Sequence, residues 1–162
     1  MAEAKIIDVF LGPPDFGDFA RRPPLITVHL AADPAWTPQK EDWPIFNGKT
    51  YRAMLDTGAD FCSVDQMVAG EISAHVEGNG NVNVFGGPAK ISGRARVQVI
   101  LPSASQVYET RFAIMDFRGV GQPWDAILGR NFLRHCRLIV DGPRGRYDLE
   151  WIGADPIPKK SE

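Results

Sequence analysis

The stretch MLDTGADFCSV, which runs from Met54 to Val64, decides how the rest of the sequence is interpreted. An ionisable side chain, Asp56, directly follows an apolar run, and Thr57 and Gly58 come next before the chain returns to apolar residues. Because Asp, Thr and Gly all favour turns, an exposed Asx-type turn is one interpretation. The apolar residues on both sides favour another, in which the turn is buried and its carboxylate takes part in chemistry.

Length and composition predict one domain that is mostly β. The chain has 162 residues, which suits a single hydrophobic core. It contains 16 Gly and 13 Pro, a share that favours turn-rich β structure over a helical fold. β-Branched runs and alternation of apolar with polar residues predict the main strands, at residues 25–32, 49–56, 90–101, 107–115 and 146–151.

Charge and cysteine content limit which partners and which cellular compartment we expect. The formal net charge is −2 and the charges are spread along the chain, so we expect no nucleic-acid partner and no polybasic membrane patch. No apolar run approaches the ~20 residues of a membrane span. The two cysteines, Cys62 and Cys136, lie beside apolar residues, and the N-terminal apolar run is too short for a signal peptide. We therefore expect free thiols, a cytoplasmic setting and peptidic or small-molecule partners.

Two segments depart from the strand pattern. Residues 1–23 combine a short apolar stretch with several Pro and Gly, which predicts an extended arm. Residues 34–48 form a long connection that contains Trp36 and Trp43. These two side chains either pack on the domain as a hydrophobic lid or form a platform for a substrate or partner.

Local signals also predict a helix and a hairpin beyond the opening stretch. Ser63 and Gln66 have the spacing of a capping box, which predicts a short helix across residues 65–69. Residues 77–88 are rich in glycine and lead into a hairpin that we expect over residues 89–115. A strand, a short helix and another strand are expected after this hairpin, before the last strand.

A catalytic Asp56 needs a second carboxylate. Two carboxylates that share one proton act as base and acid together, because like charges a few ångströms apart cannot both ionise. The sequence holds a single Asp-Thr-Gly, and a two-lobed enzyme would need about twice this length. We therefore expect a homodimer in which two Asp56 side chains meet at the two-fold axis and Thr57 meets Thr57.

Three blocks of the sequence resemble the retropepsin-like aspartic proteases, the single-domain dimeric relatives of pepsin. They are LDTGAD at residues 55–60, VFGGPAKISGRARVQV at residues 84–99 and DAILGRNFL at residues 125–133. The order and spacing of three segments rarely coincide by chance. The resemblance implies a mostly β, closed-barrel acid protease fold with one or two short helices and a flap hairpin.

The resemblance also implies a division of the chain and roles in the active-site turn. The arm at residues 1–23 precedes a protease domain at residues 24–152, and a C-terminal tail follows at residues 153–162. Asp56 corresponds to the catalytic aspartate. The residues that support the turn are Thr57, Gly58 and Ala59. Asp60 and Arg130 correspond to an ion pair that ties the turn to the C-terminal helix.

Two further motifs are assigned by the resemblance. The flap tip, which contacts substrate, corresponds to Phe85, Gly86 and Gly87. Pro88 departs from the family pattern there and removes a backbone donor. The apolar-apolar-Gly signature corresponds to Ile127, Leu128 and Gly129.

The function implied by the resemblance is an aspartic endopeptidase that cleaves polypeptides through a water activated by two Asp56 carboxylates, without a cofactor or metal. One alternative is a catalytically silent dimeric module of the same fold that binds peptides. Another is a purely structural β domain. The intact Asp-Thr-Gly favours the enzyme, because a silent module does not need a costly pair of carboxylates.

Cysteine and histidine residues offer weaker alternatives. Cys62 with His75 would form a thiol–imidazole pair, and the adjacent His135 and Cys136 would contribute to a zinc site. Structural zinc sites need four ligands at recognisable spacing, which the sequence does not show. We therefore interpret both cysteines as small core residues.

Overall fold

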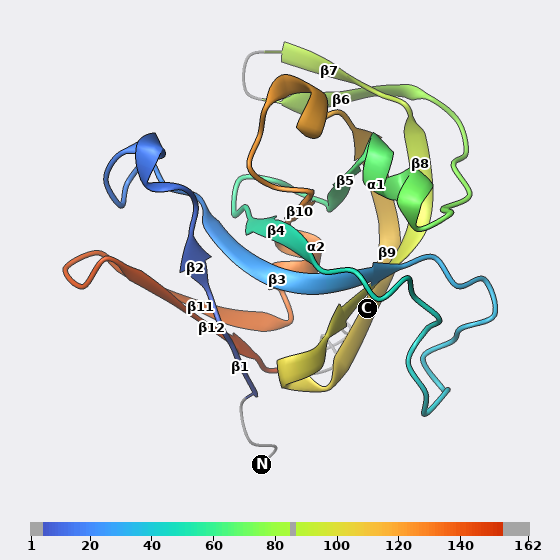
Figure 1. Cartoon of the computed structure of the whole chain (residues 1–162), viewed down its shortest axis with the longest axis horizontal. Helices are drawn as coiled ribbons and strands as arrows, with labels where there is room; N and C mark the ends of the chain where they lie inside the picture. The colour runs from blue at the N-terminus through green and yellow to red at the C-terminus, as the bar shows by residue number, and fades with distance from the viewer. Residues whose placement is uncertain (1–4, 85–86, 154–162) are drawn as a thin grey trace, which may run out of the picture.

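Six strands form a closed barrel in the computed structural model, which describes residues 5–84 and 87–153 (Figure 1). These strands are β3 (Pro24–Ala31), β4 (Tyr51–Leu55), β5 (Ser63–Asp65), β8 (Gly93–Leu101), β9 (Gln106–Met115) and β10 (Ala126–Leu128). Around the barrel they follow the order β3, β4, β10, β5, β9 and β8, and β3 closes the barrel by pairing with both β4 and β8. The prediction of a mostly β, closed-barrel fold is confirmed.

Alternating side chains explain how the barrel strands face the core. In β8, Ala95 and Val97 are buried, whereas Arg94 and Arg96 face solvent. The partner strand β9 forms the predicted hairpin with β8 and contributes Phe112, which is fully buried. The barrel interior is therefore an apolar core that positions the polar loops at its ends.

β10 is inserted between two strands that are consecutive in the sequence. It pairs in parallel with β4 and antiparallel with β5. At its start, Asp125 Oδ2 accepts a hydrogen bond from the Arg52 N–H (2.9 Å), and the Asp125 carbonyl accepts one from the Asp65 N–H (2.8 Å). Because β10 fills the space between β4 and β5, the segment that connects these two strands must cross over the far end of β10.

A second hairpin lies at one end of the barrel (Figure 1). Its strands, β6 (Gly80–Val84) and β7 (Gly87–Ile91), are antiparallel. The chain leaves this hairpin through Gly93, where φ is +140° and an added Cβ would lie 2.5 Å from the Gly78 carbonyl oxygen. Only glycine fits this conformation and this close approach, so the base of the hairpin is tightly held.

A three-stranded sheet joins the two ends of the described chain. β1 (Lys5–Ile7) and β11 (Cys136–Asp141) both pair antiparallel with β12 (Arg146–Trp151), which lies between them. β2 (Phe10–Leu11) pairs instead with β3 of the barrel. Within the segment predicted to be an arm, these two short strands are therefore hydrogen-bonded to the sheets of the domain.

Two short α-helices are present, as predicted, but the capping box at Ser63 is wrong. Helix α2 (Arg130–Leu133) follows β10, and helix α1 (Gln66–Glu71) follows β5. The N-cap of α1 is Asp65, whose side chain accepts a hydrogen bond from the Met67 N–H (2.8 Å). Ser63 belongs to β5 and pairs with β10, so sheet pairing delays the helix by two residues.

The two tryptophans of the connection at residues 34–48 differ in burial. Trp36 is only 5% exposed, and its indole Nε1 donates to the Asp42 carbonyl oxygen (3.0 Å). Trp43 is 43% exposed. Trp36 therefore packs as the lid interpretation predicts, whereas Trp43 leaves part of its ring at the surface.

Asp65 is a fully buried carboxylate that no sequence motif identifies. Its Oδ1 accepts hydrogen bonds from the N–H groups of Phe117 (2.8 Å) and Arg118 (2.9 Å), while its Oδ2 caps α1. A buried carboxylate is tolerated where backbone donors surround it in this way. Asp65 therefore joins β5 and α1 to the connection that leads from β9 to β10.

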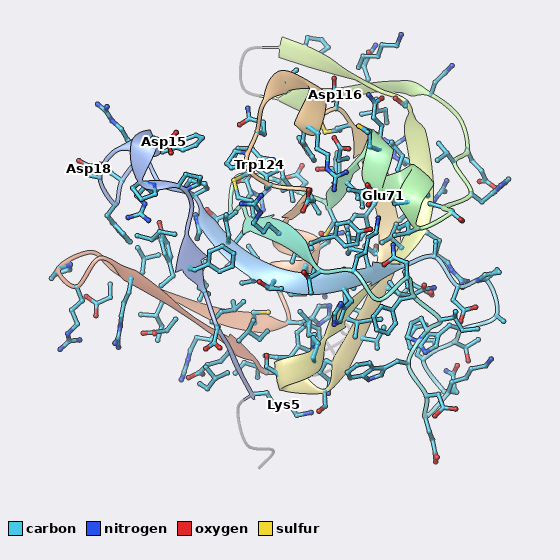
Figure 2. The ribbon with its side chains drawn as sticks, in the orientation of Figure 1. Lys5, Asp15, Asp18, Glu71, Asp116 and Trp124 are labelled. Atoms are coloured by element: carbon cyan, nitrogen blue, oxygen red, sulfur yellow. The ribbon has the colours of Figure 1, made fainter. Side chains whose placement is uncertain are left out.

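Arg118 extends this polar support to the end of α1. Its guanidinium lies 2.7 Å from Glu71 Oε1 and 3.1 Å from Asp125 Oδ1, and Figure 2 shows Glu71 on α1. Hydrogen bonds from Arg118 and from the Tyr51 hydroxyl lower the pKa of Glu71. This arrangement offsets the unfavourable position of a carboxylate at a helix C-terminus.

We expect Asp65→Asn to destabilise the fold. Both oxygens of Asp65 accept hydrogen bonds from backbone N–H groups, and in asparagine an NH₂ group replaces one of these oxygens, so donor faces donor. The cost should be about 1–3 kcal/mol, the penalty for buried donors without partners. Urea unfolding of the purified chain measures it. The matched control is Asp18→Asn, at an exposed position, which should unfold at the same urea concentration as the wild type; equal stability of all three proteins would contradict the role of Asp65.

Candidate active site

The Asp-Thr-Gly turn lies directly after β4. The Asp56 N–H donates to the Leu128 carbonyl oxygen of β10 (3.1 Å). The Asp56 side chain accepts a hydrogen bond at Oδ1 from the Gly58 N–H (2.8 Å), and the Asp56 carbonyl accepts one from the Ala59 N–H (3.3 Å). The backbone therefore fixes this carboxylate at the end of the barrel strands.

In the single chain this turn is exposed, which corrects the expectation that it is buried. Asp56 is half-buried and both Thr57 and Gly58 are exposed, although Leu55 and Cys62 on either side belong to the core. The apolar flanks reflect strands that face the barrel interior, while the turn projects beyond the barrel. The surface formed by these turn residues is available to a partner.

Helix α2 contacts the Asp-Thr-Gly turn and stabilises it. The Arg130 guanidinium donates to the Thr57 carbonyl oxygen (2.7 Å) and pairs with the Asp60 carboxylate. Backbone hydrogen bonds add to this contact, from the Arg130 N–H to the Ala59 carbonyl (2.8 Å) and from the Asn131 N–H to the Asp60 carbonyl (3.2 Å). The ion pair is exposed and stabilises little by itself, so its main effect is to orient the turn.

Gly129, directly after β10, lies close to the backbone of the Asp56 turn and of the residues that follow it. A Cβ at this position would lie 2.5 Å from the Phe61 carbonyl oxygen and 2.8 Å from the Ala59 carbonyl oxygen. Both atoms belong to the backbone, so neither can move aside cheaply. The preceding residues of the signature lie in β10, where Leu128 is buried and Ile127 is half-buried. The structure thus brings the turn, the ion pair and the apolar-apolar-Gly signature together.

The predicted flap tip lies only partly within the described residues. Gly87 and Pro88 belong to β7, and Pro88 pairs in register with Asn83 of β6. Phe85 and Gly86 fall outside the part of the chain that the structure describes. The β6–β7 hairpin itself is present, at the place in the chain where the resemblance puts the flap.

Asn131 supports the turn, although the sequence motifs do not assign it a role. Its Oδ1 lies 3.1 Å from the Cys62 Sγ, which donates to it, and it also accepts from the Phe132 N–H (3.0 Å). The signal for it was its place directly after Gly129 and Arg130. Asn131 therefore links α2 to the residue that directly precedes β5.

The thiol chemistry considered from the sequence finds no support here. Burial raises the pKa of the Cys62 thiol to about 12, so this thiol is protonated and a poor nucleophile at neutral pH. His75 is exposed and lies against Glu77 (3.5 Å) instead of Cys62. Cys136 is also a free thiol, and burial raises its pKa to about 12. Both cysteines act as packing residues.

Two further features concern metal ions and membranes. Among the described residues, no three His, Cys, Asp or Glu side chains lie together as a metal ion would require. In the same part of the chain, no helix is both long and apolar enough to cross a membrane.

The fold and the turn define a class of protein, and comparison with known families agrees. The family described as "gag-polyprotein putative aspartyl protease" matches residues 45–135, which is more than half of the chain. The chain belongs to this family. No curated protein matches it.

Three solved structures are similar to the chain, to different degrees. A retropepsin-like aspartic protease from Rickettsia conorii superposes with a TM-score of 0.56 at 11% identity, over 93% of this chain and 97% of that one. An EIAV protease bound to an inhibitor has a TM-score of 0.46 at 17% identity, over 69% of this chain and 86% of that one. The retroviral protease-like domain of Ddi1 from Leishmania major has a TM-score of 0.43 at 17% identity, over 84% of this chain and 96% of that one. The first of these similarities supports the retropepsin-like fold.

We expect Gly129→Ala to destabilise the protein by about 1–3 kcal/mol, because the new methyl group collides with backbone that cannot yield. Thermal or urea unfolding measures the change. Gly142→Ala is the matched control, since a Cβ there meets nothing within 4 Å and should leave stability nearly unchanged. A Gly129→Ala protein as stable as this control would show that the turn is not packed on β10 as described.

Proposed function

We propose that this protein is an aspartic endopeptidase whose working unit is a homodimer with one Asp56 from each chain in a shared site. The observation that carries the proposal is an Asp-Thr-Gly turn that is rigidly held by its backbone yet exposed at the surface. The Gly58 N–H fixes one oxygen of Asp56 at 2.8 Å, and β10 and α2 support the turn from below. Membership of the aspartyl protease family supports the same chemistry.

The chemistry follows from two carboxylates that share one proton. The ionised carboxylate removes a proton from a water molecule. At the same time the water oxygen forms a bond to the carbonyl carbon of the peptide. The protonated carboxylate gives its proton to the carbonyl oxygen, which yields a neutral tetrahedral diol. As the diol collapses and its C–N bond breaks, one diol hydroxyl gives its proton to the ionised carboxylate, and a carboxyl proton passes to the leaving amine. The pair ends with one proton, as it began.

A second chain supplies what one chain lacks. The exposed faces of Thr57 and Gly58 leave the turn open to its symmetry mate, and an isologous contact there brings Asp56 to Asp56. The predicted burial of the carboxylate would then arise from association. Leu55 and Cys62 on either side of the turn already belong to the core of each chain, whereas Phe61 is 37% exposed.

The substrate is an extended polypeptide. The β6–β7 hairpin is a two-stranded sheet with open edges, and an extended peptide binds such an edge by backbone hydrogen bonds. In this proposal the hairpin acts as a flap that closes over the peptide, and its tip includes Phe85, Gly86 and Gly87. Pro88 has no N–H, so hydrogen bonds to substrate must come from its neighbours.

We expect Asp56→Asn to lower the rate of peptide cleavage by about 10²–10⁴-fold, because the amide neither shares a proton nor accepts one from water. Cleavage of a diverse peptide pool between acidic and neutral pH, followed by mass spectrometry, measures this. Unfolding in urea should be unchanged. The matched control, Asp18→Asn, should cleave like the wild type.

The same experiment distinguishes the enzyme from the silent peptide-binding module. If the wild type binds peptides from the pool but cleaves none at any pH, the protein is a binding module. If Asp56→Asn retains full turnover in a preparation free of other proteases, Asp56 is not the catalytic residue.

We expect activity per chain to fall on dilution, because a site built from two chains is lost when the dimer dissociates. Mixing wild type with an equal amount of the Asp56→Asn chain should lower activity per wild-type chain by about half once subunits have exchanged, since random pairing places about half of the active chains in heterodimers. An equal mass of an unrelated protein is the control. Sedimentation that shows a monomer with undiminished activity would overturn the shared site.

A further inference from the structure

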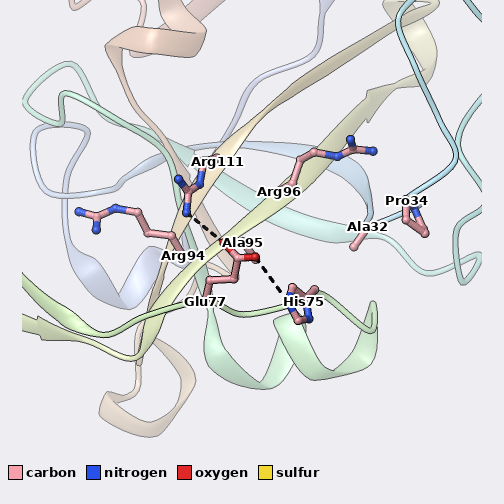
Figure 3. Close-up of a pocket in the computed structure, with 8 residues that line it drawn as sticks. All are labelled: Ala32, Pro34, His75, Glu77, Arg94, Ala95, Arg96 and Arg111. Atoms are coloured by element: carbon pink, nitrogen blue, oxygen red, sulfur yellow. Dashed lines mark ion pairs between the residues drawn. The ribbon is translucent and has the colours of Figure 1, made fainter.

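Three arginines gather on the outer face of the barrel, on β8 and β9. Arg96 and Arg111 lie directly opposite each other in the antiparallel register, and Arg94 precedes Arg96 by two residues on the same face. We call these three residues the arginine strip. Figure 3 shows the strip beside Glu77 and His75, which come from the segment that leads into the β6–β7 hairpin.

The strip has an electrostatic cost that the described contacts offset only in part. Like charges directly opposite each other across two strands are destabilising. Arg96 is well compensated, since its guanidinium lies 3.1 Å from Glu109 and donates to the carbonyl oxygens of Asp33 (2.9 Å) and Trp36 (3.2 Å).

The other two arginines have weaker partners. Arg111 lies 3.7 Å from Glu77, a distance beyond a normal hydrogen bond, and both side chains are 63% exposed. Among the described residues, Arg94 has no ion pair. Arg94 and Arg111 therefore retain most of their capacity to bind an anion.

A cavity of about 300 Å³ lies along the strip. Its lining contains the three arginines against a single carboxylate, Glu77, which leaves a formal charge of +2 when His75 is neutral. The whole chain has a net charge of −2, so this surface is opposite in sign to the protein that carries it. The remaining lining residues are small or apolar and form no barrier to a bound chain: Ala32, Pro34 and Ala95.

The arrangement of the side chains favours an extended ligand over a compact one. In Figure 3, Arg94 and Arg96 point in opposite directions along the sheet, with Glu77 and Ala95 between them. Their guanidinium groups therefore face different parts of the surface. Carboxylates spaced along a peptide reach several of them, and guanidinium groups bind carboxylates with directed hydrogen bonds.

We infer that the arginine strip binds an acidic segment of the polypeptide substrate, away from the bond that is cleaved. This inference rests on the proposed function only in naming the ligand a substrate; the binding of an acidic peptide does not depend on catalysis. The strip adjoins the base of the β6–β7 hairpin, where Glu77 and Arg94 exchange backbone hydrogen bonds of 2.8 and 2.9 Å. A bound acidic segment would compete with Glu77 for Arg111 at this position.

The test measures binding of a fluorescein-labelled peptide of eight glutamates by fluorescence anisotropy, in the Asp56→Asn background so that no cleavage can occur. We expect the double variant Arg94→Gln, Arg111→Gln to bind at least about fivefold more weakly, and added salt to weaken the wild-type binding. A peptide of eight glutamines should not bind. Arg96 is left intact because it supports the backbone of the adjoining loop.

The matched control removes the same charge elsewhere. Arg144→Gln, Arg146→Gln changes two exposed arginines at the turn between β11 and β12, and should bind the acidic peptide like the background protein. Equal affinity of the strip variant and the background, or an equal loss in this control, would overturn the inference. Inorganic phosphate that displaces the peptide at equal molar concentration would also overturn it, because it would show a compact anion site.

A second readout separates this inference from the proposed protease. In otherwise wild-type protein, the strip variant should raise KM for a substrate that carries an acidic segment, leave kcat unchanged, and not affect a substrate with glutamines in its place. Arginine-dependent binding without any cleavage would leave the strip in place and refute the protease. Cleavage in which neither peptide binding nor KM depends on the arginines would support the protease and refute the arginine strip as a binding site.

Discussion

The close contact between Gly129 and the backbone of the Asp56 turn is the constraint on which the site depends. β10 lies between β4 and β5, which are consecutive in the sequence, so the turn that joins them must cross the end of β10. The crossing leaves no room for a Cβ at Gly129, where the nearest carbonyl oxygen would be 2.5 Å away. The same crossing places Arg130 under the turn and gives Asp56 a fixed direction. Under the proposed function, a rigid turn of this kind would hold the Asp56 carboxylate in place without reorganisation.

Polar groups support the barrel at the other end of β10. Asp125 bonds to the backbones of β4 and β5, while the buried Asp65 accepts three backbone N–H groups from α1 and from the segment after β9. Both ends of β10 are therefore fixed, one by carboxylates and the other by close backbone packing. The turn residues themselves contribute little to this core, which leaves them free to form an interface.

Parts of the site were predictable because they depend on short-range sequence. The position of Asp56 after an apolar strand, the alternation in β8, and the strand–helix order around Gly129 follow from local patterns, and the structure has them. The cap of α1 was misplaced because Ser63 is used in sheet pairing, which is a long-range contact. Asp65, Asp125 and Asn131 were not recognised for the same reason, since their partners lie far away in the sequence.

The sequence by itself determined five of the six barrel strands, all but β5, together with the resemblance to retropepsin-like proteases and the candidate Asp56, because periodicity and short motifs are local properties. Only the tertiary structure decided that the turn is exposed in a single chain, that Trp36 is buried while Trp43 is not, and that three arginines share one face with a cavity. Exposure, cavities and like-charge neighbours depend on which strands pair and in what register. Strand register is set by the packing of the whole core, and no segment of the sequence carries it alone.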